Sequence, residues 1–439
     1  MTFVRPARRV LIAAVSMSAL FVAAACGGGG GGEGAAPEGG ATSAAVDFTK
    51  QGDIELWQGK DVSGNLPKLV KQFNDSHPNG KVTLHELPDE ADQQRQQMIQ
   101  NAQIKNPKMA VLSMDVVWTA EFAAKGYVEA LPPDTSTEGM LKATVDSASY
   151  FNKLYGLPST TDGGLLYYRK DLLDKYQLQP PTSFDEMKAA CDKITAGEND
   201  SKLACFAGQY NKYEGLTVNF DEAVHGAGGV IVGPDGKPNV ATPEATKGLQ
   251  TLTDWFKNGD IPKAAITWTE EEGRQAFQSG ELIFHRNWGY VYNLANKTDG
   301  SSKVAGKFDV APLPGITGPG VSSLGGHNYA IAKYAENKGT AMDFLKFMSS
   351  EEVQKSNTLA TSNSPALESL YTDPEVLKKL PFMDIQLKSI QTAVPRPIVV
   401  EYGDVTLAIQ DAAYGALQGQ TQPDAALQAL QSKLQTLIK

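Results

Sequence analysis

The stretch 53–87, DIELWQGKDVSGNLPKLVKQFNDSHPNGKVTLHEL, contains two short apolar runs separated by an amphipathic segment. The runs 53–57 and 81–87 are rich in β-branched and large apolar residues and are bounded by turn residues, so they predict strands. Between them, apolar side chains recur with the i, i+3, i+4, i+7 spacing of one helix face, at Leu66, Leu69, Val70 and Phe73. A strand, a helix and a second strand in this order predict a β-α-β unit, and hence a parallel sheet with helices on its faces.

The same alternation continues toward the C-terminus. Further apolar runs predict strands at 109–114, 164–168 and 282–284. Apolar stripes predict helices at 184–194, after a cap at Thr182 and Ser183, around 249–256, and at 404–417 and 423–438. A folded body of about 390 residues, beginning near residue 50, exceeds what one hydrophobic core usually serves, so we expect two lobes.

The first 26 residues predict export from the cell. A basic region with three arginines precedes the run 10–25, which is apolar but too short to span a bilayer. We interpret residues 1–25 as a secretory signal peptide. The next residue, Cys26, resembles the cysteine of a bacterial lipobox, which implies its acylation, although Ala23 stands where a lipobox usually has Leu. Ordinary cleavage, which leaves a free thiol, is the alternative.

The segment after Cys26 is almost wholly Gly, Ala, Pro, Ser, Thr and Glu up to residue 45. Such a segment has no apolar surface to bury and predicts a flexible coil. We therefore assign residues 26–49 to a lipid anchor and tether that hold a monomeric body at the extracytoplasmic face of the bacterial cell membrane. The formal net charge of −10 argues against nucleic acid or an anionic membrane surface as a partner of that body.

Cys191 and Cys205 are the cysteines that remain besides Cys26. A pair of cysteines in an oxidising compartment predicts a disulfide that closes a short loop. Two buried free thiols are the alternative.

Motifs for metal, cofactor or nucleophilic chemistry are missing from the sequence. The histidines at 77, 85, 225, 285 and 327 have no paired-ligand spacing, and there is no G-x-S-x-G elbow, Walker loop or zinc-type cysteine cluster. We therefore expect no metal, no cofactor and no enzyme activity. A glycosidase that uses two carboxylates leaves no spacing signature, so a surface glycosidase with Asp115 and Asp162 stays open as an alternative.

Aromatic, acidic, amide and arginine side chains at predicted strand ends suit a neutral sugar. Aromatic faces pack against the C–H face of a sugar ring, and charged groups form hydrogen bonds with its hydroxyls. Such sites lie outside the carboxyl ends of parallel strands. Asp115 ends a predicted strand, where it is either a ligand or a helix cap. Asp162 precedes two glycines, where it is either a ligand or a turn residue.

Three further candidates follow later in the chain. Trp288 and Tyr290 come directly after the predicted strand 282–284, although aromatic residues there often belong to the core. Arg396 lies between two prolines that restrict the backbone and would hold the guanidinium in place; a solvated arginine is the alternative.

These segments resemble the extracellular solute-binding proteins of family 1, and within it the trehalose/maltose-binding proteins of ABC importers. The matching stretches are MDVVW at 114–118, DGGLLYYRKDLL at 162–173, YEGL at 213–216, RNW at 286–288, VAPLP at 310–314, LGG at 324–326 and AVPRPI at 393–398. They run in order from about residue 53 to the C-terminus.

The resemblance implies an α/β fold of the periplasmic-binding-protein type (type II), with two lobes that are each a mainly parallel sheet flanked by helices. Chain crossings near 158–162, 310–314 and 357–365 would form the hinge. The implied lobes are 50–157 with 310–359, and 158–309 with 360–439. The sugar contacts implied residue by residue are Asp115, Asp162, Trp288, Tyr290, Gly326, Arg396 and, on a weaker match, Arg95.

This sequence departs from the pattern of that family at two sites. Thr160 and His327 stand where the trehalose/maltose type has aromatic residues, so the pocket wall differs, and we keep His327 as a candidate sugar contact. An acidic contact expected within 59–65 aligns poorly. Asp61 and Asn65 are its candidate substitutes, of which we count Asn65 among the nine predicted sugar contacts. We expect a lipid-anchored protein that binds an α-glucosyl disaccharide, such as trehalose or maltose, and delivers it to the permease subunits of an importer. Another carbohydrate, either an oligosaccharide or a glucosylated polyol, is the alternative ligand.

Overall fold

The computed structural model describes residues 46–438. The predicted signal peptide 1–25, Cys26 and all but the last residues of the predicted tether lie outside this range. Among the described residues, no helix is both long enough and apolar enough to cross a membrane.

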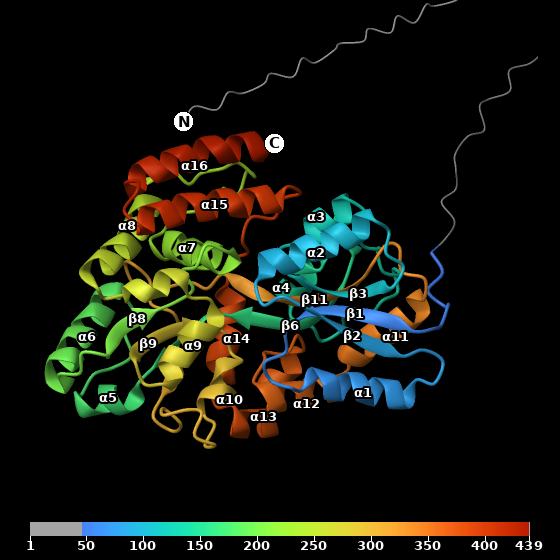
Figure 1. Cartoon of the computed structure of the whole chain (residues 1–439), viewed down its shortest axis with the longest axis horizontal. Helices are drawn as coiled ribbons and strands as arrows, with labels where there is room; N and C mark the ends of the chain where they lie inside the picture. Colours follow the sequence, from blue (N-terminus) through green and yellow to red (C-terminus); the bar gives the residue numbers. More distant parts are fainter. Residues whose placement is uncertain (1–45, 439) are drawn as a thin grey trace, which may run out of the picture. The chain divides into compact units, whose positions relative to one another are not determined.

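The first sheet has the strand order β2-β1-β3-β11-β6. Strands β1 (Ile54–Gly59), β2 (Val82–Leu87) and β3 (Met109–Asp115) pair in parallel, as the sequence predicts. Helix α1 (Leu66–Ser76) connects β1 to β2, and α2 (Ala91–Gln103) connects β2 to β3. The two helices lie on opposite sides of these strands (Figure 1), and the predicted stripe on α1 is buried.

The second sheet has the order β10-β7-β9-β8, from strands β10 (Asp309–Ala311), β7 (Leu165–Tyr168), β9 (Leu282–Asn287) and β8 (Ala204–Ala207). Helix α6 (Phe184–Glu198) begins at Ser183, whose hydroxyl accepts a hydrogen bond from the Glu186 amide, as the predicted cap requires. A disulfide joins Cys191 on α6 to Cys205 on β8, in agreement with the sequence prediction.

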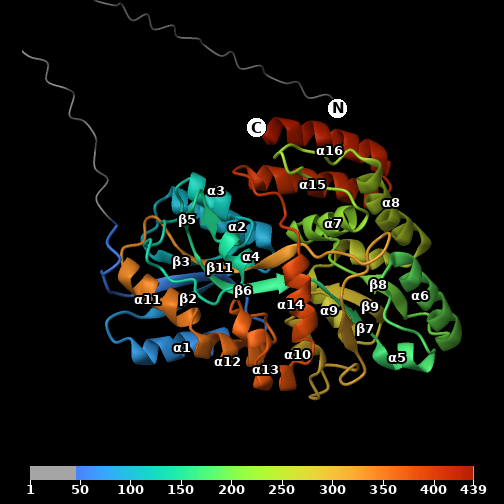
Figure 2. The ribbon, with the colours of Figure 1, turned by 180° about the vertical axis from the view of Figure 1, so that it is seen from behind.

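A layer of long helices completes the second half of the fold. Helices α7 (Glu214–Gly226) and α8 (Pro243–Asn258) pack against α15 (Tyr402–Leu417) and α16 (Pro423–Leu437). These four helices lie together at the top of Figure 2, above the strands of the second sheet. The predicted apolar stripe of α16 is buried in this layer, at Leu427, Leu430 and Leu434.

The remaining elements connect and cover the two sheets. The short strands β4 (Ser149–Tyr150) and β5 (Lys153–Leu154) pair with each other. The other helices are α3 (Thr119–Ala124), α4 (Lys142–Ser147), α5 (Lys170–Lys175), α9 (Glu270–Gln278), α10 (Val291–Ala295), α11 (Lys338–Met348), α12 (Glu351–Thr361), α13 (Pro374–Lys379) and α14 (Met383–Thr392), with 3-10 turns at Lys263–Thr267 and Glu368–Tyr371.

Buried apolar side chains form two separate clusters, one around each sheet. We call the elements around the first sheet the first lobe and those around the second sheet the second lobe. The chain leaves the first sheet at the end of β6 (Leu157–Gly163) and enters the second at β7, and it returns between β10 and β11 (Leu324–Ile331). The lobe limits expected from the sequence stay a prediction; the whole of β6 pairs within the first sheet and β10 pairs within the second.

Strand pairing differs from the expected mainly parallel sheets, because both sheets are mixed. In the first sheet β11 runs antiparallel to both β3 and β6, and in the second sheet β7 runs antiparallel to β9 and β10. The reason is the route of the chain. Strand β11 arrives from the second lobe, so it begins beside the end of β3 and runs back along it, without the helical crossover that parallel pairing needs.

Candidate functional site: a cleft lined by both sheets

The site lies in a cavity of about 380 Å³ that is lined by residues from both lobes. It is bounded by the end of β3, the residues after β9 and the strand β11, which is where ligand sites form in open α/β sheets. Seven of the nine predicted sugar contacts line this cavity: Asp115, Asp162, Trp288, Tyr290, Gly326, His327 and Arg396.

Two of these residues, Asp115 and Arg396, bind each other. The Arg396 Nη2 donates to Asp115 Oδ1 over 2.8 Å, and its Nη1 donates to Glu214 Oε1 over 2.5 Å. Only 2% of Arg396 is exposed, so the solvated arginine that the sequence left open is excluded. Asp115 Oδ1 also accepts from the Val117 amide over 3.1 Å, so its carboxylate caps the turn after β3 while it holds the arginine.

Glu214, at the start of α7, is a site residue that the sequence did not single out, although it lies within the matched stretch 213–216. Besides Arg396, it accepts hydrogen bonds from the hydroxyls of Tyr402 and Thr406. Burial raises the pKa of its carboxyl, and Arg396 opposes that rise. Glu214 therefore fixes the second side of the guanidinium from the second lobe, while Asp115 fixes the first side from the first lobe.

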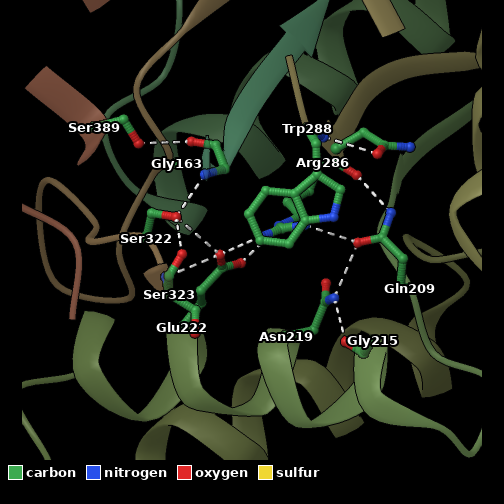
Figure 3. Close-up of polar contacts among 12 residues, drawn as sticks. Gly163, Gln209, Gly215, Asn219, Glu222, Arg286, Trp288, Ser322, Ser323 and Ser389 are labelled. Atoms are coloured by element: carbon green, nitrogen blue, oxygen red, sulfur yellow. Dashed lines mark hydrogen bonds and ion pairs between the residues drawn. The ribbon is translucent and has the colours of Figure 1, made fainter. Parts of the chain in front are cut away.

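Trp288 forms an aromatic wall of the cavity and is half-buried. Arg286 lies beneath the ring, with its Cζ atom 3.9 Å from the ring centroid (Figure 3). A Cβ atom at Gly325 would come within 2.9 Å of the Trp288 ring, so the glycine is needed for this close approach. The tryptophan thus belongs to the site and not to the core.

Two tyrosines beside Trp288 point their hydroxyls at the start of α9. Tyr290 donates to Glu271 Oε1 over 2.7 Å, and Tyr213 donates to Glu270 Oε2 over 2.6 Å. These bonds hold both phenol rings in place along the cavity wall. Glu271 is itself held by Arg274, which donates to both of its carboxylate oxygens.

Strands β6 and β11, by which the chain leaves and re-enters the first sheet, form one wall of the cavity. Asp162 on β6 lies opposite Gly325 on β11, and burial raises the pKa of its carboxyl to about 6. Gly326 has a φ of 116°, and a side chain there would collide with the backbone of Thr160. Burial lowers the pKa of His327, so its imidazole is neutral at pH 7.

Two predicted contacts are not part of the lining, so this geometry does not support a direct role for them. Arg95 lies on α2, where its Nη2 is 2.5 Å from Glu121 Oε1. The amide nitrogen of Asn65 donates over 3.0 Å to the side chain of Asn357. In the loop 59–65, it is Asp61 that lines the cavity, while its carboxylate accepts hydrogen bonds from the Ser63 and Leu66 amides.

Comparison with known proteins shows the family to which the chain belongs. Residues 58–355 match the family of the bacterial extracellular solute-binding proteins. The chain belongs to this family. A probable ABC transporter-binding protein of Deinococcus radiodurans is 33% identical over 405 residues, which cover 89% of this chain and 92% of the relative. The galactooligosaccharide-binding protein of Bacillus subtilis is 24% identical over 396 residues, 88% of this chain and 89% of the relative.

A solved structure agrees with the assignment. The maltose-bound MalE3 of T. maritima superposes with a TM-score of 0.83 at 31% identity, over 88% of this chain and all of that one. The expected two-lobed fold of a periplasmic binding protein is therefore confirmed.

As an extracellular solute-binding protein, the chain is a binding component of a transport system and not an enzyme. The glycosidase alternative, with Asp115 and Asp162 as its carboxylates, is thereby set aside.

One signal in the sequence of this solute-binding protein could have identified Arg286 as the residue beneath the Trp288 ring. Alternate residues of a strand point to the same face, and Arg286 and Trp288 are two positions apart at the end of β9. Glu222, which accepts hydrogen bonds from Arg286, and Glu214, which accepts them from Arg396, had no comparable signal. They lie 64 and 182 positions from these arginines in the sequence.

Proposed function

We propose that the protein binds an α-glucosyl disaccharide of the trehalose or maltose type in this cleft and presents it to the permease subunits of an ABC importer. One juxtaposition supports the proposal: an aromatic platform, Trp288, faces the same cavity as a buried arginine–carboxylate cluster at Arg396. A cavity of about 380 Å³ lies in the range typical of small-ligand sites.

The chemistry of the lining matches the two faces of a sugar. The indole of Trp288 packs against the C–H face of a glucosyl ring, and carboxylate oxygens accept hydrogen bonds from its hydroxyls. Arg396 lines the cavity and holds these carboxylates in place through its bonds to Asp115 and Glu214. An aromatic wall on one side and charged groups on the other suit a sugar ring, which has an apolar C–H face and polar hydroxyl groups.

The charge of the lining favours an uncharged ligand. Its carboxylates outnumber its cations, so an anionic sugar would be repelled. The acidic residues are Asp61, Asp89, Glu90, Asp115, Asp162, Glu214, Glu270 and Glu271, against Lys60, Lys297 and Arg396.

The ligand would act by population shift between open and closed forms. A sugar that contacts both lobes binds the closed form more strongly and draws the equilibrium toward it. Hydrogen bonds already join the lobes. Gln410 donates to Asp92 over 3.1 Å and Lys125 donates to Glu401 over 2.8 Å, both outside the cavity lining, and Asn211 donates over 3.3 Å to Glu90, a lining residue. The importer would then recognise the closed form.

The named relatives favour carbohydrate as the ligand class. Their names specify maltose, galactooligosaccharide and, for a Pseudomonas aeruginosa protein at 24% identity, mannitol. An oligosaccharide or a glucosylated polyol is therefore the second candidate. We further propose that the protein is a monomer anchored through an acylated Cys26, with residues 26–49 as tether.

Calorimetric titration of the mature chain with trehalose, maltose, a galactooligosaccharide, mannitol and an anionic glucuronide tests the proposal. We expect binding of one α-glucosyl disaccharide, recovery of that sugar intact, and no binding of the glucuronide. The variant Trp288→Ala should weaken binding tenfold to hundredfold, about 1–3 kcal/mol, at an unchanged melting temperature. Binding of the glucuronide alone would overturn the assignment to an uncharged sugar, and binding of no carbohydrate would overturn the ligand class.

A further inference from the structure

The side chain beneath Trp288 is itself held by a buried network. Arg286 is 2% exposed, and its Nε and Nη2 donate to the two carboxylate oxygens of Glu222 over 2.8 and 2.5 Å. Its Nη1 donates to the amide oxygen of Gln209 over 3.1 Å. A guanidinium bound on both edges cannot rotate without breaking a bidentate pair, so the plane under the indole ring is fixed (Figure 3).

Gln209 completes the support from the other side. Its amide nitrogen donates to the backbone carbonyl of Arg286 over 3.0 Å, and its oxygen also accepts from Asn219 over 3.1 Å. Asn219 and Glu222 both lie on α7. The long helix α7 therefore anchors the arginine through two independent contacts.

Glu222 also reaches the segments through which the chain passes between the lobes. Its Oε1 accepts from the Ser323 amide over 3.2 Å, just before β11. The neighbouring hydroxyl of Ser322 accepts from the Gly164 amide over 2.5 Å, between β6 and β7. The Glu222 carboxylate thus contacts the segment before β11, by which the chain returns to the first lobe (the return crossing), directly. It is linked through Ser322 to the segment between β6 and β7, by which the chain leaves the first lobe (the forward crossing).

The forward crossing packs tightly against the ion pair. A Cβ atom at Gly164 would lie 2.7 Å from Arg286 Nη2 and 3.0 Å from Glu222 Oε1. The stability of the fold does not require a charged pair here. Replacing a buried ion pair by well-packed apolar residues of similar volume often leaves the free energy of unfolding unchanged or raises it. What the charges add is a fixed direction for each partner.

We propose that Arg286 and Glu222 are positioning residues for ligand binding: they fix the plane of the Trp288 ring and hold it at a set place relative to both crossing segments. This inference rests on the proposed function for the identity of the ligand, but the ring position itself is measurable without ligand. If the Trp288 ring is already fixed, less side-chain entropy is lost when a sugar stacks on it. Ligand affinity should therefore depend on Arg286 and Glu222, although neither residue lines the cavity.

The test uses the mature chain labelled with 5-fluorotryptophan. Fluorine NMR reports the surroundings of each indole, and the resonance missing from the Trp288→Phe variant is that of Trp288. The double variant Arg286→Met/Glu222→Gln removes both charges at similar volume. We expect its Trp288 resonance to shift and broaden while the other four tryptophan resonances stay in place. Affinity for maltose or trehalose, whichever the wild type binds, should fall about tenfold.

The matched control is Arg169→Met/Asp171→Asn, which removes another bidentate pair with bonds of 2.7 and 2.6 Å away from the cavity lining. It should leave the Trp288 resonance and the affinity unchanged. If the first double variant does not fold, Gly164→Ala, whose methyl group lies against the guanidinium, takes its place. A wild-type resonance, or a shifted resonance with unchanged affinity, would overturn the proposal. If the wild type binds no sugar, the proposed function fails while the resonance still tests the ring support.

Discussion

Arg396 and Asp115 are 281 positions apart in the sequence and form a buried ion pair of 2.8 Å, with Glu214 on the other side of the guanidinium. Sequence reasoning assigned Asp115 and Arg396 separately to the ligand. The structure shows that they first orient each other, and that the arginine joins a carboxylate from each lobe. The cluster therefore presents a preorganised donor and acceptor set, which reduces the cost of ligand binding.

Arg396→Ala should be strongly destabilising. It leaves two buried carboxylates without their cation, and breaking a buried pair on one side costs about 3–5 kcal/mol. Asp115→Asn should cost less, because Arg396 keeps Glu214. Urea unfolding measures both. Lys71→Ala, which breaks an exposed pair with Asp75, is the control and should change nothing measurable. Equal and small decreases in the free energy of unfolding for all three variants would contradict this prediction.

Asp162 should make stability depend on pH. Burial raises its folded pKa from 3.8 to about 6, so between these values the folded state keeps a proton that the unfolded state has lost. The folded state is thus favoured at pH 4 and loses this advantage as the pH rises to 6, by about 2–3 kcal/mol. Asp162→Asn removes the effect. The difference in free energy of unfolding between variant and wild type should therefore shift in favour of the variant from pH 4 to pH 6. A difference that is constant with pH would speak against it.

Gln410→Ala should weaken ligand binding although Gln410 does not line the cavity. It removes the hydrogen bond to Asp92 that joins the lobes, and the closed form loses about 0.5–1.5 kcal/mol. We expect the dissociation constant to rise about threefold to tenfold in calorimetric titration. Gln431→Ala is the matched control, because Gln431 bonds to Val240 and Pro238 within the second lobe. An equal effect of both substitutions would refute a role in closure.

Replacement of Cys191 and Cys205 by serine should lower stability without changing ligand affinity. The disulfide spans a sequence separation of 14 residues, and a loop of this size contributes about 3 kcal/mol. The bond joins α6 to β8, which are not part of the cavity lining. Chemical denaturation and titration of the serine variant measure the two quantities. A large loss of affinity in a folded variant would show that the bond also shapes the site.

The sequence by itself determined the local elements of this protein. The spacing of Leu427, Leu430 and Leu434 predicted α16, and the runs flanking α1 predicted β1 and β2. Such predictions succeed because helix and strand periods bring residues that are near in sequence onto one face. The sequence also indicated Trp288, since an aromatic residue directly after a strand lies at the sheet edge where ligands bind.

The tertiary structure alone decided how these pieces meet. It made β11 antiparallel in a sheet that was expected to be mainly parallel, and it placed Arg95 and Asn65 outside the cavity lining. It also brought Glu214 and Glu222 to the two buried arginines. The physical reason is that the energy of a charge pair depends on the distance between the two groups in space. The position of a carboxylate in the sequence does not indicate which arginine it will pair with. Arg396 meets Asp115 only because the two lobes and the crossing segments close around them.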